Sequence, residues 1–227
     1  MTQWQRFLDT FFNWPVIEEY LPAIGNGFLV TCQLAILVVV CGIALGLLLA
    51  FVRAYRIRLL NVLIVIFVDV LRALPPLVLI LMLYFGLPNL EINFTGFTVV
   101  WLVLTLVLAA FAEEIFWAGM LSVDQGQWSA ARSTGLSYTQ TLVYVILPQA
   151  VRMTIPPLTN RTIAITKNTA LGMVVGVGEI LNEATTAQAF SGNASPLMVG
   201  AIAYVLLFVP VVILGRRIEK RFAWKKA

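Results

Sequence analysis

The chain has 227 residues, of which 60% are apolar or aromatic and only 11% are charged, with a formal net charge of +4. Soluble domains carry about 25% charged and roughly 45–50% apolar residues, and a chain of this length has no core that could bury such an apolar excess. These numbers exclude a soluble globular enzyme, a disordered chain and a fibrous protein; they predict an all-α, polytopic membrane protein whose basic excess reflects topology rather than a nucleic-acid partner.

The N-terminal segment 1–25 is predicted to form a short amphipathic helix on the outer (periplasmic) surface of the membrane. Acidic residues interrupt it at Asp9, Glu18 and Glu19, so it lacks the unbroken apolar stretch of a cleaved signal peptide. Its apolar residues recur at helical spacing, which favours a helix lying in the interface, and a frayed tail is the alternative. These apolar residues are Trp4, Phe7, Leu8, Phe11 and Phe12.

Five apolar stretches reach the length of about 20 residues that a membrane-spanning helix needs. The first and the fifth contain no charged residue, whereas the other three do. Together they form a predicted transmembrane domain over 26–215, followed by a basic cytoplasmic tail over 216–227. The predicted spans are 26–52, 59–84, 97–120, 155–177 and 196–215.

The positions of the basic residues predict the orientation of these spans. The loops 86–96 and 178–195 contain no Lys or Arg, and the N-terminal segment contains Arg6 alone. Because basic residues are enriched in cytoplasmic loops, we expect the N-terminus outside and the C-terminus in the cytoplasm, which agrees with five spans. The basic residues assigned to the cytoplasmic side are Arg53, Arg56, Arg58, Arg132, Arg152, Arg216, Arg217, Lys220, Arg221, Lys225 and Lys226.

The sequence predicts no metal site or bound cofactor in this chain. It contains no histidine, and its two cysteines, Cys32 and Cys41, are nine residues apart. Nine residues turn a helix through about 900°, which puts the two thiols on opposite faces and favours packing roles.

The third loop, about 121–150, contains the most informative pattern. Asp124 followed by Gln127, and Ser137 followed by Gln140, are capping-box patterns that begin helices. Gly135 between them can adopt the left-handed conformation that ends a helix. The loop therefore predicts a short helix, a sharp turn and a second helix. It is either an ordinary interfacial helix or a rigid knob offered to a cytoplasmic partner.

This loop resembles the EAA loop of ABC-importer permeases. That pattern is Glu-Ala-Ala, three residues, Gly, nine residues, Ile, any residue and Leu-Pro. Here Ser129-Ala130-Ala131, Gly135 and Val145-Ile146-Leu147-Pro148 follow its spacing, with Ser129 in place of the usual Glu. Other segments resemble the polar-amino-acid branch of that family, in which an Arg is common at the position of Trp117. These segments are Asn26-Gly27 with Thr31, Arg72-Ala73-Leu74-Pro75, Ala112-Glu113-Glu114-Ile115 with Gly119, and Lys167-Asn168-Thr169-Ala170-Leu171.

The resemblance implies an inner-membrane permease subunit of a bacterial importer. It implies ABC ATPase subunits as cytoplasmic partners, a second permease subunit, identical or a sister, and an external solute-binding protein. ATP and Mg would be bound by the ATPase, and this chain has no phosphate loop because none of its four lysines follows a glycine. The residues implied to contact the ATPase are Gln127, Ser129, Ala130, Ala131, Gly135, Leu136 and Ser137.

Several charged residues are predicted to lie at membrane depth. A charge at the centre of a bilayer costs about 2.5–3.5 kcal/mol on insertion scales, so such groups should face the bundle interior and pair. Asp69 lies one helical turn before Arg72 and can face it. The charges are either structural ion pairs or part of a substrate path, with Lys167 on the carboxylate side of an amino acid and Glu114 on the ammonium side. The candidate path residues are Arg72, Glu114, Arg161, Lys167, Asn168 and Thr169.

The fourth span is polar for a lipid-facing helix, which favours a position along a water-filled route. Pro156 and Pro157 are predicted to begin it, because proline in the first turn loses no helical bond. The alternative function is a stand-alone channel or ion-coupled carrier, which the absence of an internal repeat disfavours. A membrane-embedded enzyme is disfavoured because adjacent Glu113 and Glu114 point about 100° apart on a helix.

Overall fold

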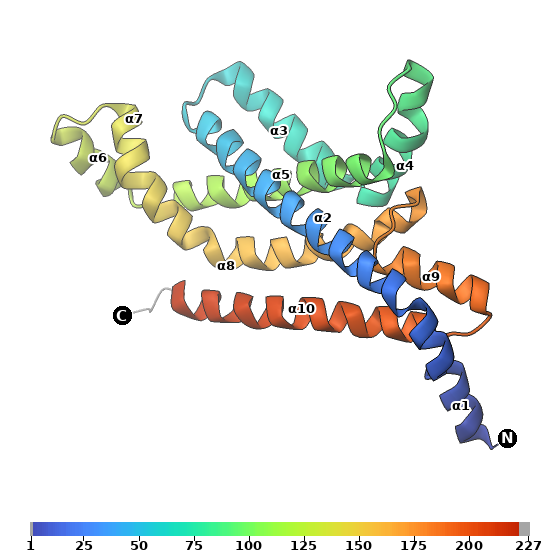
Figure 1. Cartoon of the computed structure of the whole chain (residues 1–227). Helices are drawn as coiled ribbons and strands as arrows, with labels where there is room; N and C mark the ends of the chain where they lie inside the picture. The colour runs from blue at the N-terminus through green and yellow to red at the C-terminus, as the bar shows by residue number, and fades with distance from the viewer. Residues whose placement is uncertain (1, 223–227) are drawn as a thin grey trace. The chain divides into compact units, whose positions relative to one another are not determined.

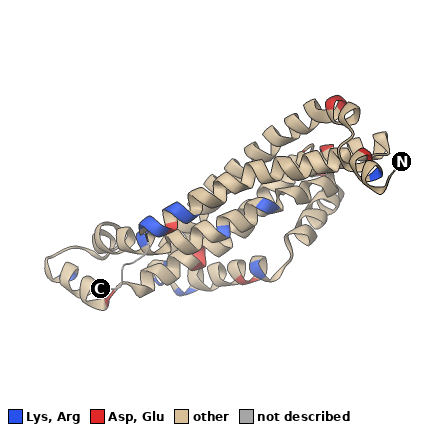
Figure 2. Ribbon diagram, turned by 90° about the horizontal axis from the view of Figure 1, so that it is seen from below, with Lys and Arg blue, Asp and Glu red and all other residues tan. Residues whose placement is uncertain are grey.

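The computed structural model describes residues 2–222, and every regular element in that range is helical (Figure 1). This confirms the all-α class. Charged residues are sparse along the ribbon, as the composition requires (Figure 2). Of the predicted basic tail, Lys225 and Lys226 lie outside the described residues. The elements are α1 (Gln3–Phe11), α2 (Trp14–Ala54), α3 (Arg58–Ala73), α4 (Pro76–Gly86), η1 (Leu87–Leu90), α5 (Gly96–Ser122), α6 (Gln125–Ser133), α7 (Tyr138–Thr141), η2 (Leu142–Ile146), α8 (Leu147–Thr166), η3 (Lys167–Val175), α9 (Ile180–Ser191) and α10 (Ser195–Phe222).

Three helical stretches are long and apolar enough to cross a membrane, and two bent helix pairs reach that length only together. Counting each pair as one span gives the predicted number of five. The single stretches are Gln3–Ala54, Gly96–Ser122 and Ser195–Phe222, and the pairs are Arg58–Ala73 with Pro76–Leu90 and Tyr138–Val175 with Ile180–Ser191.

The first long helix begins earlier than the sequence pattern indicates. The N-terminal segment contains a helix, α1, which begins at a capping box between Thr2 and Gln5. However, α2 begins at Trp14 and runs unbroken to Ala54, so no helix boundary lies at residue 26. The acidic residues Glu18 and Glu19 are exposed on this helix, and their charge therefore does not interrupt it.

The second span is broken at a Leu-Pro-Pro sequence. Helix α3 ends at Ala73, and Leu74 is extended, with φ −90° and ψ 135°. A residue before proline is pushed out of the helical region by the proline ring, which explains why the helix stops there. Pro76 then occupies the first turn of α4, where its missing N–H removes no helical bond.

The fourth span differs most from the prediction. Pro156 and Pro157 lie inside α8 instead of starting a helix. The helix is entered from α7 through a π-helical segment, η2, and it continues into the 3-10 helix η3. Membrane helices tolerate internal proline where other groups satisfy the freed carbonyls. The region 178–195, predicted as a loop, contains helix α9, which ends at Gly192 with a left-handed φ of 63°.

The described chain forms two compact units. The first consists of the residues up to Val39, Pro75–Thr105 and Ile165–Val211. The second consists of Val40–Leu74, Leu106–Ala164 and the residues from Val212.

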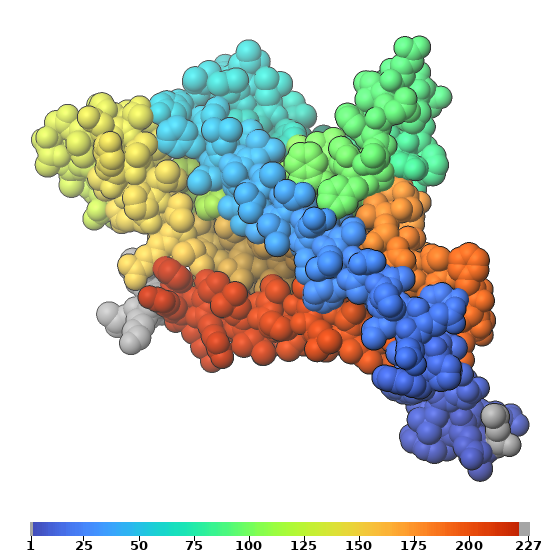
Figure 3. Space-filling model, viewed as in Figure 1, coloured from blue at the N-terminus to red at the C-terminus, as the bar shows by residue number. Residues whose placement is uncertain are grey.

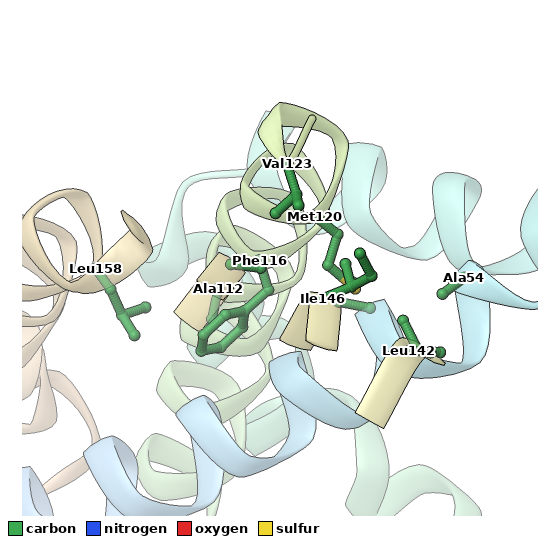
Figure 4. Packing of buried hydrophobic residues seen from close by; sticks show 10 residues of the cluster. Ala54, Ala112, Phe116, Met120, Val123, Leu142, Ile146 and Leu158 are labelled. Carbon is green, nitrogen blue, oxygen red and sulfur yellow. The ribbon is translucent and has the colours of Figure 1, made fainter. Parts of the chain in front are cut away.

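The core of the second unit is an aliphatic and aromatic cluster between α2, α5 and the η2–α8 segment. Phe116 projects from α5 beside Ala112 in Figure 4, with Ile146 next to Met120. Gly46 on α2 allows close packing here, because a Cβ atom at that position would lie 2.5 Å from the Cβ of Ala112. The buried members are Ala50, Ala54, Ala112, Phe116, Met120, Val123, Leu142, Ile146, Ala150 and Leu158.

Candidate functional site

The third loop folds into the predicted helical hairpin, which we call the knob and define as residues 125–141. Helix α6 begins at Asp124, whose carboxylate accepts the backbone N–H of Gly126 at 2.7 Å. In a complete capping box the Gln127 side chain would accept the backbone N–H of Asp124. Among the described contacts its side-chain oxygen instead accepts a hydrogen bond from the Gln149 side chain at 3.4 Å. In the space-filling view the knob is yellow to yellow-green (Figure 3).

The turn of the knob has the conformation that the sequence predicts. Gly135 has φ 89°, a region that residues with a Cβ atom rarely adopt. Its N–H donates to the carbonyl of Arg132, and the Arg132 side chain donates to the carbonyl of Leu136 at 2.8 Å. Ser137 and Gln140 then form a complete capping box that begins α7. Local sequence signals therefore specify this hairpin.

The predicted ATPase-contacting residues fall into two groups. Ala131 is buried, with 8% of its surface exposed, so it packs the knob against its own unit. Leu136 is half-buried. The exposed positions, which are free to contact a partner, are Gln127, Ser129, Ala130, Gly135 and Ser137.

Hydroxyl contacts of Tyr138 and Thr139 attach the knob to the chain at the end of α2. Tyr138 stacks on Trp128 with ring centroids 5.3 Å apart, and its hydroxyl donates to the Ala54 carbonyl at 2.5 Å. The hydroxyl groups of Tyr55 and Thr139 lie 3.2 Å apart in a second link between the same elements. These contacts join the knob directly to the C-terminal end of α2. No sequence pattern predicts this attachment, because tyrosines are common at membrane interfaces.

A buried ion pair lies next to this attachment. Glu113 is fully buried on α5, and the Arg53 guanidinium at the end of α2 donates to both of its oxygens, at 3.0 and 3.2 Å. The same guanidinium lies 4.7 Å from the centre of the Trp117 ring. The sequence pattern assigns Arg53 only to the cytoplasmic side, directly after the first predicted span. An acidic residue deep in an apolar span should have indicated that it needs a basic partner.

Three of the candidate path residues come together around one aromatic ring in the second unit. Phe111 has the Arg161 guanidinium 3.9 Å and the Arg72 guanidinium 5.3 Å from its ring centre. Arg72 also forms a salt bridge with Glu114. The expected partner of Arg72 was Asp69, but across residues 2–222 the salt bridges are Arg53–Glu113 and Arg72–Glu114.

The other three candidates lie on η3 in the first unit. Lys167 is exposed, and its ammonium lies 6.0 Å from the centre of the Phe208 ring. Asn168 is half-buried, whereas Thr169 is buried and donates its hydroxyl to the Thr166 carbonyl at 2.9 Å. Thr169 is therefore engaged with its own backbone, while Lys167 and Asn168 are the accessible pair.

The first unit contains a buried carboxylate, Glu179, that no sequence pattern singled out. Glu179 begins α9 by accepting the N–H groups of Leu181 and Asn182, at 3.0 and 2.8 Å, and it also accepts the Tyr204 hydroxyl at 2.5 Å. A Cβ atom at Gly27 would lie 3.0 Å from the Glu179 backbone, which explains a glycine at that position of the first span. Its three hydrogen bonds give Glu179 a structural role.

The cysteines and acidic residues offer no metal site. Cys32 and Cys41 are both free thiols. Over residues 2–222 no group of three or more Cys, Asp or Glu residues is arranged to hold a metal ion.

Comparison with known proteins gives consistent matches over most of the chain. The family model described as "Binding-protein-dependent transport system inner membrane component" matches residues 42–224. The "Probable glutamine ABC transporter permease protein GlnP" of Bacillus subtilis (strain 168) is 33% identical, covering 90% of this chain and 95% of that protein. The "Glutamine transport system permease protein GlnP" of Escherichia coli (strain K12) is 30% identical, covering 92% of this chain and 97% of its own length.

A solved structure agrees with these sequence matches. One described as "Crystal structure of an amino acid ABC transporter with histidines" superposes with a TM-score of 0.82 at 30% identity. The alignment covers 90% of this chain and 96% of that one. The chain belongs to the family of inner-membrane components of binding-protein-dependent transport systems.

Proposed function

We propose that this chain carries a polar amino acid across the inner membrane by alternating access, coupled to a separate ATPase through the exposed face of the knob. Its family makes it a multi-pass permease subunit of an ABC importer, without ATPase activity of its own and with ATPase and solute-binding partners. Two relatives are named for glutamine transport, which supports glutamine or a related amino acid, such as glutamate or aspartate, as the substrate. A second permease subunit, identical or a sister, would complete the pathway.

The knob is the observation that carries the coupling part of the proposal. Its turn is fixed by Gly135, and Tyr138 attaches it to α2. A rigid element with an exposed face and a direct link to a long helix can pass a displacement of its partner into the membrane. Ser129 has no charge, so we infer that the ATPase docks by shape through the small exposed side chains of Ser129 and Ala130.

The coupling proposal is tested by a matched pair of exposed alanines. Ala130→Trp places a bulky side chain on the exposed face of α6, and Ala189→Trp makes the same change on exposed α9. In vesicles with the ATPase and the binding protein, we expect Ala130→Trp to abolish ATP-driven uptake of glutamine and Ala189→Trp to leave the knob–ATPase coupling intact. Uptake by wild-type protein without ATP would contradict an ABC mechanism, and full uptake by Ala130→Trp would contradict docking at this face.

For substrate contact, we propose Lys167 and Asn168 as the side chains that hold the amino acid's carboxylate. Lys167 takes part in no salt bridge among residues 2–222, so its ammonium group is available to a substrate carboxylate. Arg72, Arg161 and Glu114 form the second candidate set; there an incoming ammonium group would compete with Arg72 for Glu114.

The carboxylate contact is tested by the substrate dependence of uptake. A hydrogen bond to a charged group contributes about 1.5–3 kcal/mol, so Lys167→Gln should raise the KM for glutamine by about tenfold or more. Lys167→Arg keeps the charge and should retain most of the affinity. Lys220→Gln removes a charge near the end of α10 and serves as the control. An unchanged KM in Lys167→Gln would remove this residue from the pathway without affecting the coupling proposal.

A further inference from the structure

A cavity of about 300 Å³ opens in the second unit, at the base of the knob. Its lining combines aromatic rings with basic and amide groups, and none of the described residues that line it is acidic. Such a lining is suited to a ligand that is anionic at one point and apolar beside it. The lining groups with this chemistry are Arg56, Arg132, Gln125, Trp117, Trp128 and Tyr138.

The backbone at Arg56 is held in a disfavoured conformation beside this cavity. Arg56 has φ 56°, in the left-handed region, where a residue with a Cβ atom is strained. Its N–H donates to the Arg53 carbonyl at 3.0 Å, which closes the turn after α2. Strained residues cluster at functional sites, where the surrounding structure holds them in place. Here the turn brings a guanidinium to the rim of an aromatic-lined space.

The other side chains that line the cavity are held by contacts that leave most N–H donors of Arg132 unused. Arg132 uses one N–H to bond the Leu136 carbonyl, and a guanidinium has five such donors. Trp128 is held by stacking on Tyr138, and Trp117 receives the Arg53 guanidinium over its ring. The cavity is therefore built from positioned groups, and two arginine residues, Arg56 and Arg132, line it.

The size and chemistry of the cavity favour a phosphate group. Its volume equals that of about ten water molecules and lies at the low end of small-molecule pockets. Arginine pairs with phosphate oxygens through two parallel hydrogen bonds. In the proposed orientation the knob is cytoplasmic, where Trp and Tyr sit at headgroup level and anionic lipids give the leaflet its negative potential.

We propose that this cavity binds the phosphate of an anionic phospholipid from the cytoplasmic leaflet. Arg56 and Arg132 hold the phosphate, and the rings of Trp117 and Trp128 contact the adjoining glycerol and first methylenes. The proposal rests on the orientation given under the proposed function, but it is independent of the substrate and of ATP hydrolysis. Loss of lipid binding and loss of transport are therefore separate results.

The test is a titration of the full-length purified chain in detergent, with bound lipid counted by native mass spectrometry. The probes are dioleoyl phosphatidylglycerol and dioleoyl phosphatidylcholine. We expect the anionic lipid to bind about tenfold more tightly, and the double variant Arg56→Asn with Arg132→Gln to lose that preference. Asparagine tolerates the left-handed conformation, so the turn is retained. Arg216→Gln with Arg217→Gln removes the same charge from α10 and should keep the preference.

Four results would overturn the proposal, and the fourth is competition by a soluble phosphate. One is equal binding of both lipids, and another is an equal loss in the charge-matched α10 control, which would indicate unspecific attraction. A third is that the pocket variant binds lipid normally but no longer captures the ATPase, which would assign the cavity to that partner. Glycerol phosphate and inorganic phosphate are titrated in parallel. Competition by either at the affinity of the lipid would retain the anion site but overturn its assignment to the membrane.

Discussion

Two neighbouring carboxylates on α5 have opposite surroundings. Glu113 is fully buried and is bonded through both oxygens to Arg53, whose side chain is 19% exposed. Glu114 has 47% of its side chain exposed, and its partner Arg72 has 32%. Successive residues on a helix point about 100° apart, so one carboxylate enters the packed core while the next lies outside it.

This difference in burial distinguishes a carboxylate with a structural role from one that is accessible to a ligand. A buried ion pair is costly to break, because removing one partner leaves the other charge without compensation. A half-exposed pair can exchange partners with water or with a passing ligand at small cost. Glu113 and Arg53 therefore belong with the attachment of the knob, whereas Arg72 and Glu114 form the half-exposed pair within the second set of substrate contacts that we propose.

The largest expected effect is at Glu113. Glu113→Ala leaves the Arg53 guanidinium unpaired in the core and should lower the free energy of unfolding by about 3–5 kcal/mol. The measurement is denaturant unfolding of the purified chain in detergent. Replacing both partners, Arg53→Met with Glu113→Leu, should recover much of this loss, because two apolar side chains leave no orphaned charge. A double variant as unstable as Glu113→Ala would contradict the assigned pairing.

Phe111 is the aromatic residue at the half-exposed ion pair. Its ring lies beside two guanidinium groups, and cation–π contacts contribute about 0.5–2 kcal/mol each. Phe111→Leu keeps an apolar side chain but removes both contacts, so we expect a stability loss of about 1–2 kcal/mol. Phe111→Tyr keeps the ring and should stay close to wild type. Equal losses in the two variants would contradict a stabilising cation–π contact, because Phe111→Tyr retains the ring.

Tyr138 tests the attachment of the knob without changing a charged residue. Tyr138→Phe removes the hydrogen bond to the Ala54 carbonyl and should cost about 1 kcal/mol, because the aromatic stacking on Trp128 remains. Thr139→Val tests the weaker link to Tyr55 in the same way. If the knob transmits force through Tyr138, ATP-driven uptake should fall in Tyr138→Phe more than in Thr139→Val. Equal uptake in both would place the transmission elsewhere.

Local signals account for what the sequence predicted well. The capping box of Ser137 and Gln140, and the positive φ of Gly135, depend on residues within a few positions of one another. The turn and the start of α7 were therefore predictable, as was the number of apolar stretches, whereas the capping box expected between Asp124 and Gln127 does not form. The start of α2 was harder to predict, because the charged residues Glu18 and Glu19 are tolerated on an exposed helix face.

Other features depend on tertiary contacts that no local pattern records. Pro156 and Pro157 are typical of a helix start, yet they lie within α8. The pairing of Arg72 with Glu114 instead of Asp69 joins α3 to α5, and nothing in the spacing of either helix specifies that choice. Glu179 likewise looks like a loop residue until its three hydrogen bonds are seen.

The smallest expected effect on stability is at Glu114. Glu114→Gln removes the charge that Arg72 contacts, but both side chains are partly in contact with solvent, so the loss should stay within about 1 kcal/mol. At 1 M salt the difference from wild type should shrink further, because charges are screened over about 3 Å there. The Glu113→Ala loss should persist at that salt concentration, since its partner is shielded from ions. If Glu114 contacts an amino acid's ammonium group, the same variant should weaken uptake despite its near-normal stability. A large, salt-insensitive loss of stability in Glu114→Gln would make the two carboxylates alike and remove the basis for treating Glu114 as available to a substrate.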